Sequence, residues 1–177
     1  MIKIRKAIAN DVYEIRKVQK ETWFKTYPNA KEGIAIGDIE EKFKKDETPE
    51  GKKKIEEQKK YYEDRKYQVL IAEENNKIIG FCTAGKEKEN NRIRAIYVLP
   101  NYQGKGVGRL LIEKAFNWLG TDKDILVNVA RYNKQAIDFY KAAGFMATGR
   151  CGVFDEGAKL PSGKLIPEIE MVKKASS

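Results

Sequence analysis

A group of closely spaced glycines between a predicted strand and a predicted helix constrains the fold of this chain more than any other feature. Residues 93–99 form an apolar, β-rich run that ends at Pro100, and Gly104, Gly106 and Gly108 follow. The next apolar residues keep the spacing of one helix face: Val107, Leu110, Leu111, Ala115 and Trp118. A strand that enters a helix through a glycine-rich turn predicts a domain in which strands and helices alternate.

This turn is suited to binding an anion. The free N–H groups and the dipole of a helix N-terminus attract negative charge, and glycines let a phosphate approach the backbone. Lys105 and Arg109 add positive charge beside it. The Rossmann fingerprint GxGxxG and the P-loop pattern GxxxxGK(S/T) do not fit the segment QGKGVGR. On the glycines alone, an ordinary strand–helix turn is an equally good interpretation.

The remaining pattern predicts a single mixed α/β domain over residues 1–177, with the element order β-α-α-β-β-β-α-β-α-β-β. Ahead of the central strands, helical spacing indicates helices before Pro28, over 38–45 and over 52–66. Asn75 and Asn76 give a hairpin signal between two β-rich runs. The longer predicted strands cover residues 67–73, 77–84, 93–99, 125–129, 145–154 and 165–173.

The amino-acid composition removes several classes of catalysis. The chain contains no histidine, which excludes Ser-His-Asp triads, Cys-His dyads and zinc sites with histidine ligands. Cys82 and Cys151 lie far apart without CxxC spacing, so we interpret both as reduced thiols and predict no metal site. Any catalysis must therefore use carboxylates, tyrosine, lysine or backbone groups.

The net charge of +9 indicates an anionic partner. Basic and acidic residues are mixed along the whole chain, and the run KKKIEEQKK fits a solvated helix face better than a nucleic-acid patch. The anionic partner need not be a nucleic acid, because a phosphorylated cofactor would serve equally well, and we predict no specific nucleic-acid binding. The sequence has neither the roughly 18-residue apolar run of a membrane span nor an apolar signal segment, so we expect a soluble cytoplasmic protein.

Two segments of the chain resemble the GCN5-related N-acetyltransferase (GNAT) superfamily. The segment Gln103-Gly104-Lys105-Gly106-Val107-Gly108, preceded by Val98-Leu99-Pro100, is similar to the acetyl-CoA motif (Q/R)-x-x-G-x-(G/A) of that family. Residues 133–145, NKQAIDFYKAAGF, are similar to its N-x-x-A-x-x-F-Y-x-x-x-G-F element. Because both motifs occur in order on matching elements, the chain is identified as a member of this superfamily.

The resemblance implies a splayed, mixed β-sheet flanked by helices, with acetyl-CoA as cosubstrate between the strand that ends near Leu99 and the strand 125–129. The pantetheine would pair with the backbone of Ile96 and Val98, and a bulge near Val98 would free that edge. The implied cofactor-binding residues are Ile96, Val98, Gln103, Gly104, Lys105, Gly106, Val107, Gly108, Arg109, Asn133 and Lys141.

The resemblance also implies catalytic roles. Tyr140 matches the position of the general acid in many members, where it would protonate the CoA thiolate, and the Val98 N–H would bind the thioester oxygen. Many members carry a Glu near the start of the strand before the glycines, but residues 90–94 read NNRIR. Glu168, Glu170, a carboxylate of the first helices or water remain as candidates for the general base.

The acceptor is expected to be a primary amine of a small molecule, a polyamine included. Trp23 and Tyr27 are aromatic residues at the end of the first helix and are expected to line its groove. Two alternatives stay open: the same chemistry on a protein N-terminus or lysine, and a CoA-binding regulatory module without catalysis. The oligomeric state cannot be read from the sequence, and a homodimer is among the options.

Overall fold

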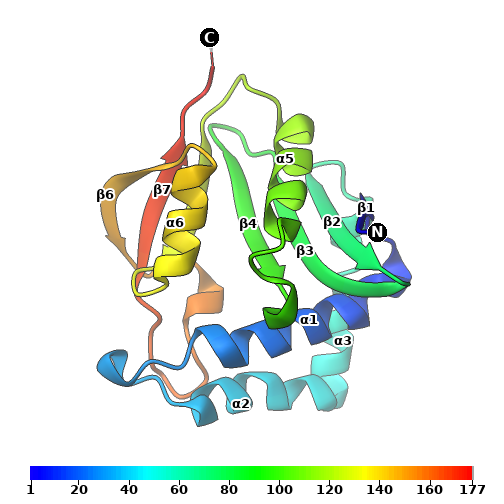
Figure 1. Ribbon diagram of the computed structural model, residues 1–177. Helices are drawn as coiled ribbons and strands as arrows, with labels where there is room; N and C mark the ends of the chain where they lie inside the picture. The colour runs from blue at the N-terminus through cyan, green and yellow to red at the C-terminus, as the bar shows by residue number, and fades with distance from the viewer. Residues whose placement is uncertain (177) are drawn as a thin grey trace.

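The computed structural model describes residues 1–176 as a seven-stranded sheet with helices on both faces (Figure 1). The strand order is β1-β2-β3-β4-β5-β7-β6, and only the β4–β5 pair is parallel. The predicted mixed α/β class is therefore confirmed. The strands are β1 Lys3–Lys6, β2 Tyr67–Glu74, β3 Lys77–Gly85, β4 Asn91–Val98, β5 Ile125–Ala130, β6 Met146–Gly152 and β7 Glu168–Lys173.

The predicted element order is wrong in one place, because it has two helices between β1 and β2 where the structure has α1 to α4. The stretch predicted as one helix over 52–66 is divided: the Gln58 N–H donates to Ile55 O within a tighter turn, and a new helix begins at Lys60. The α-helices are α1 Val12–Thr26, α2 Ile36–Lys44, α3 Pro49–Glu57, α4 Lys60–Glu63, α5 Val107–Leu119 and α6 Lys134–Ala142. None in residues 1–176 has the length and apolar character needed to cross a membrane.

Local signals set several element boundaries. The β2–β3 hairpin turns at Asn75 and Asn76, whose positive φ values of 50° and 61° asparagine tolerates better than most residues. The Asn133 side chain accepts a hydrogen bond from the Ala136 N–H at 3.1 Å and caps α6. Gly120 ends α5 with a φ of +82°.

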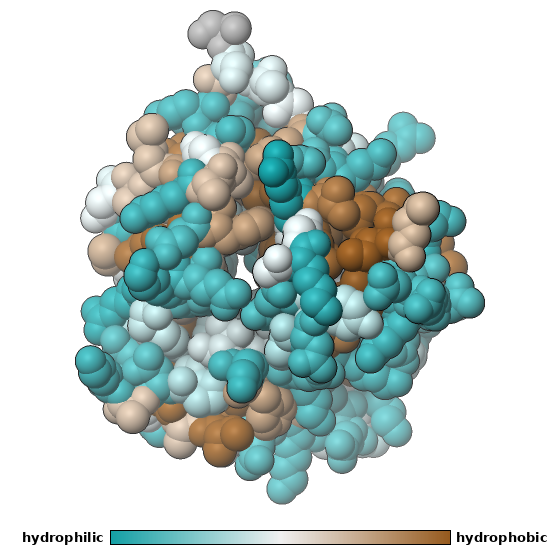
Figure 2. All heavy atoms as spheres, viewed as in Figure 1, coloured by the Kyte–Doolittle hydropathy of each residue, from teal (hydrophilic) through white to brown (hydrophobic). Residues whose placement is uncertain are grey.

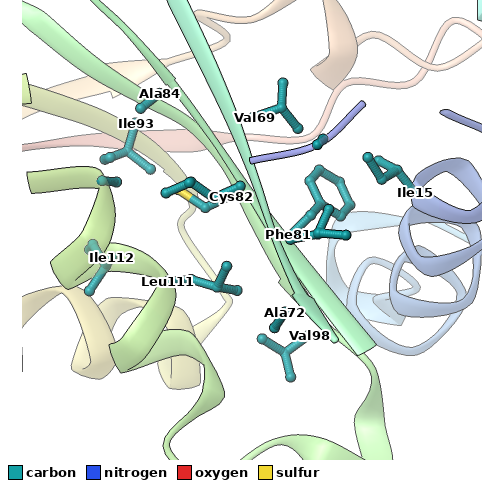
Figure 3. Close-up of a cluster of buried hydrophobic side chains, with 14 of the residues drawn as sticks. Ile15, Val69, Ala72, Phe81, Cys82, Ala84, Ile93, Val98, Leu111 and Ile112 are labelled. Atoms are coloured by element: carbon teal, nitrogen blue, oxygen red, sulfur yellow. The ribbon is translucent and has the colours of Figure 1, made fainter. Parts of the chain in front are cut away.

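The main core fills both faces of the sheet. Figure 3 shows Ile15 of α1 and Phe81 of β3 on one side, and Leu111 and Ile112 of α5 with Cys82 of β3 on the other. Helices α1 and α5 therefore pack against opposite faces. A second cluster joins α1 and α2 to β5 and to the segment between β6 and β7, and consists of Trp23, Ile34, Ile39, Phe43, Ala130, Ala158, Leu160 and Ile166.

The sheet is split between β4 and β5. These strands pair only at Asn91↔Ile125 and Arg92↔Leu126, and β5 pairs along its whole length with β7 instead. The bulge predicted near Val98 is wrong: the register of β3 and β4 shifts at Arg94, which is the extra residue of β4, and Val98 stays in register with Gly80. No bulge is needed at Val98, because the divergence of β5 already leaves that edge of β4 without a neighbouring strand.

Candidate active site

A cleft of about 590 Å³ opens where β4 and β5 diverge. Figure 2 shows the corresponding hollow between α5 and α6, with hydrophilic side chains around it. The cleft is lined by both strands, by the N-terminal ends of α5 and α6, and by the C-terminal end of α1. It therefore passes from one face of the sheet to the other.

The turn before α5 offers a row of free backbone donors. The N–H groups of residues 104–109 have no hydrogen-bond partner within residues 1–176, and no side chain caps α5. Gly104 and Gly106 have φ values of +73° and +82°, and the space that a Cβ would occupy at each is empty. Free N–H groups at a helix N-terminus, with open space in front of them, fit the pyrophosphate of CoA.

The edge of β4 that faces the cleft is also free. The Leu99 N–H donates to Ile79 O at 2.9 Å, and hydrogen-bonded residues alternate along an antiparallel pair. Ile96 and Val98 therefore direct their N–H and C=O groups away from β3, toward the cleft. The Gln103 side chain donates to Val98 O at 2.9 Å, which fixes the glycine turn to the end of this strand.

Tyr140 lies on α6 beside this edge. Its ring packs against Phe139 and Phe145, with centroid separations of 5.2 and 5.4 Å, and its hydroxyl has no hydrogen-bond partner in the described chain. Tyr140 lines the cleft although only 6% of its surface is exposed. Burial raises the pKa of Tyr140 well above its usual value, so the hydroxyl keeps its proton.

The other residues predicted to bind the cosubstrate are divided between the cleft and its surroundings. Ile96, Val107, Gly108, Arg109 and Asn133 line the cleft. Two of the predicted residues do not line it: Lys105, whose ammonium lies 5.3 Å from the centroid of the Tyr102 ring, and Lys141, which is exposed on α6.

Of the two aromatic residues predicted to line the acceptor groove, Tyr27 lies at the cleft and Trp23 is buried behind it in the second cluster. The hydroxyls of Tyr27 and Tyr97 are 3.1 Å apart, and the Tyr132 hydroxyl donates to Tyr27 O at 2.9 Å. Burial raises the pKa of both Tyr27 and Tyr97. These three tyrosines form a rigid, neutral part of the wall.

Sequence reasoning missed Asn128, Tyr97, Tyr132 and four residues near the end of α1, namely Thr22, Lys25, Thr26 and Asn29, all of which line the cleft. Asn128 donates to Asp155 Oδ2 at 3.1 Å, and its buried Oδ1 has no partner within residues 1–176. The signal for Asn128 was an amide inside the buried run ILVNVA. A buried amide oxygen without a partner is normally satisfied by a ligand or a water molecule.

The predicted candidates for the general base lie outside the cleft. Glu168 accepts hydrogen bonds from the N–H groups of Phe154 and Asp155 at 2.9 and 3.1 Å, and burial raises its pKa. Glu170 pairs with Arg150 at 3.2 Å. Within residues 1–176 no Asp or Glu lines the cleft, and no cluster of potential metal ligands occurs.

The family model for the acetyltransferase (GNAT) family matches residues 34–145, which include the glycine turn, the free edge of β4 and Tyr140. The chain belongs to the GNAT acetyltransferase family. It is 42% identical over 67 residues to the peptidyl-lysine N-acetyltransferase YjaB of Escherichia coli, a match that covers 38% of this chain and 44% of the relative. It is 28% identical over 91 residues to the L-amino acid N-acyltransferase MnaT of Escherichia coli, covering 48% and 53%.

Similarity to solved structures extends over nearly the whole fold. The PaiA N-acetyltransferase of Thermoplasma acidophilum, solved in complex with coenzyme A, superimposes with a TM-score of 0.73 at 21% identity, covering 98% of this chain and 99% of that one. At this identity the likeness concerns the fold. In sequence, the chain spans about half the length of the curated relatives it matches.

Proposed function

We propose that this protein is an acetyl-CoA-dependent N-acetyltransferase that moves the acetyl group to a primary amine by direct attack in a ternary complex. The observation that carries the proposal is the continuity of the free β4 edge at Ile96 and Val98 with the unpartnered N–H groups of residues 104–109. Tyr140 faces the same cleft. One extended ligand with a strand-like arm and a pyrophosphate would satisfy both sets of donors.

In this mechanism acetyl-CoA supplies the acetyl group as a thioester. The Val98 N–H donates to the thioester oxygen and stabilises the charge that develops there. The amine nitrogen bonds to the carbonyl carbon, the C–S bond breaks, and Tyr140 donates its proton to the departing sulfur. Burial opposes ionisation of Tyr140, but the same dry surroundings oppose a free thiolate, so proton transfer to sulfur removes that charge.

The amine must lose its extra proton without help from a carboxylate of the cleft wall, because none lines it within the described residues. The acceptor therefore enters as the neutral amine or gives its extra proton to water. After the nitrogen has bonded to the carbonyl carbon, it loses one further proton to water, which leaves the neutral amide. The Tyr140 hydroxyl is returned to its protonated form from solvent after each turnover. Release of CoA and of the acetylated amine completes the reaction.

For the acceptor, we favour the amine of a small molecule, and the reaction is proposed to occur in the cytoplasm. The name of YjaB makes a peptidyl lysine the second candidate. A CoA-binding module without catalysis is the third, and the unpartnered Tyr140 hydroxyl at the cleft argues against it. A hydroxyl that opens onto the cleft and has no partner within residues 1–176 is available to a ligand.

The proposed function is tested by release of free thiol from acetyl-CoA in the presence of primary amines, polyamines and peptides, with mass spectrometry of the products. We expect CoA to bind with micromolar affinity in calorimetry and at least one amine to be acetylated. CoA binding without transfer to any acceptor would favour the regulatory module. Absence of CoA binding would refute the proposal as a whole.

A further inference from the structure

Within residues 1–176, the charged side chains that line the cleft all carry positive charge. The charged residues that line it within residues 1–176 are Lys25, Arg94, Arg109 and Lys134, and all are basic. Arg94 pairs with Glu87 at 2.5 Å, Arg109 with Glu113 at 2.7 Å and Lys134 with Asp138 at 2.7 Å. Within the described residues, Lys25 is the member of this group that has neither an ion pair nor a hydrogen bond.

Lys25 reaches the cleft from the face of the sheet opposite the free N–H groups of residues 104–109. It lies in the last turn of α1, and α1 packs against the other face from α5 (Figures 1 and 3). Arg109 and Lys134, by contrast, stand in the first turns of α5 and α6, beside the free N–H groups. The phosphates of CoA therefore account for Arg109 and Lys134, and they leave Lys25 unexplained.

Contacts between distant segments join α2 to the segment that connects β6 and β7. Lys164, in the segment between β6 and β7, pairs with Asp38 of α2 at 2.8 Å, and Lys42 donates to Gly157 O at 3.0 Å. The second cluster packs α1 and α2 against the same segment (Figure 1). These contacts hold the end of α1, which carries Lys25, against the rest of the fold.

We propose that the acceptor is a small amine that also carries a carboxylate, as an amino acid does, and that Lys25 binds this carboxylate. This inference rests on the proposed function and names its substrate class. Lys25 is exposed at the cleft and, within residues 1–176, has no partner, so with the nearby Thr26 hydroxyl it provides charge-assisted hydrogen bonds for an anion; the Thr22 hydroxyl instead donates to Val18 O at 2.8 Å. A polyamine would instead bring further positive charge to a wall that offers no carboxylate.

The positive charge of Lys25 has a second effect on the acceptor. It opposes the ammonium form of a nearby amine and so favours the neutral form that attacks the thioester. An amine bound in this way needs no carboxylate base in the wall. The absence of a carboxylate from the described cleft lining and the presence of Lys25 there therefore both fit an acceptor that attacks as a neutral amine.

The test compares acceptors that differ only in the acid group. The L-amino acids methionine, phenylalanine and asparagine are assayed beside their carboxamides, with spermidine and a lysine-containing peptide as further acceptors. We expect the best amino acid to exceed its carboxamide at least about tenfold in kcat/KM, the factor that one hydrogen bond to a charged group supplies. A preference for spermidine or the peptide, or equal rates for acid and amide, would overturn the inference.

Two variants assign the effect to Lys25. Lys25→Met should remove the preference for the acid over the amide and leave the KM for acetyl-CoA unchanged. Lys20→Met, on the same helix but outside the cleft, should keep the preference. A raised KM for acetyl-CoA in Lys25→Met would assign this residue to the cosubstrate and overturn the proposal.

A binding measurement separates this inference from the proposed function. The amino acids are titrated by calorimetry into the protein saturated with CoA, where no transfer takes place. Binding of an amino acid but not of its carboxamide supports the inference even where turnover is slow. CoA binding without binding of any of the amino acids would overturn the inference alone, whereas loss of CoA binding itself would refute the proposed function.

Discussion

Replacing Tyr140 with phenylalanine separates chemistry from folding in this protein. The substitution keeps the ring that packs against Phe139 and Phe145 and removes only the hydroxyl. That hydroxyl has no hydrogen-bond partner within residues 1–176, so its loss leaves no buried group unpaired. We expect the free energy of unfolding to change by less than about 1 kcal/mol, because an unpaired buried hydroxyl contributes little to stability.

The expected effect on catalysis is much larger. General acid catalysis contributes about 10²–10⁴-fold, which corresponds to roughly 3–5 kcal/mol of the activation barrier. The rate of thiol release in a single turnover should fall by at least about 100-fold in Tyr140→Phe. Affinity for CoA should stay within about twofold, because the substitution leaves the N–H groups of residues 104–109 and the basic side chains near them unchanged.

The assay is rapid-quench measurement of acetyl transfer with enzyme in excess over acetyl-CoA, so that slow product release cannot hide the chemical step. Thermal unfolding and CoA titration of the same sample serve as controls. A wild-type single-turnover rate in Tyr140→Phe would refute the role of Tyr140 as acid. A large loss of stability would mean that the hydroxyl has a structural partner.

Three further predictions concern the cradle, a helix contact and the pH profile. Gly106→Val places a β-branched side chain at a φ of +82° in the space left for the phosphate, so CoA affinity in calorimetry should fall at least about tenfold. Unchanged affinity would show that the N–H groups of residues 104–109 do not bind the phosphates. Gly51→Ala should lower the free energy of unfolding by more than about 3 kcal/mol in urea titration, because its Cβ would lie 1.7 Å from Lys45 O. Gly37→Ala on α2 is the control: its Cβ would meet open space, so the free energy of unfolding should stay the same or rise. In a pH profile from 6 to 10, kcat/KM should rise toward the pKa of the amine, because within residues 1–176 no carboxylate lines the cleft. It should show no alkaline decline, because the pKa of Tyr140 is raised above its usual value of about 10. A decline below pH 9 would contradict the role of Tyr140 as the acid.

The features that sequence predicted well depend on a few neighbouring residues. The hairpin turn is set by two adjacent residues with positive φ, Asn75 and Asn76. The cap of α6 is set by the Asn133 side chain and a backbone N–H three residues later. Gly120 ends α5 for the same local reason. The glycine turn before α5 was equally readable, because positive φ at Gly104 and Gly106 is a property of the turn itself.

The features that sequence could not predict depend on pairing across the sheet and between distant segments. The bulge lies at Arg94 and not near Val98, because its position follows from the register of β4 with β3, which no residue of β4 fixes alone. The ion pair of Asp38 with Lys164 joins positions 126 residues apart. Lys25 is one of many lysines in the sequence. It becomes distinctive only in the fold, where the other charged residues of the cleft lining are paired and Lys25 has no partner within residues 1–176.

The predicted pantetheine site lies where the sheet splits between β4 and β5. Beyond Arg92 the outer edge of β4 has no neighbouring strand, because β5 pairs with β7. Unpaired N–H and C=O groups at a strand edge are available to an added strand. A ligand with an amide-containing arm would supply partners for the free groups of Ile96 and for the Val98 N–H, whereas Val98 O already accepts from Gln103 at 2.9 Å. The stability that the sheet forgoes by splitting is therefore recovered when such a ligand binds, which links the fold of this chain directly to recognition of CoA.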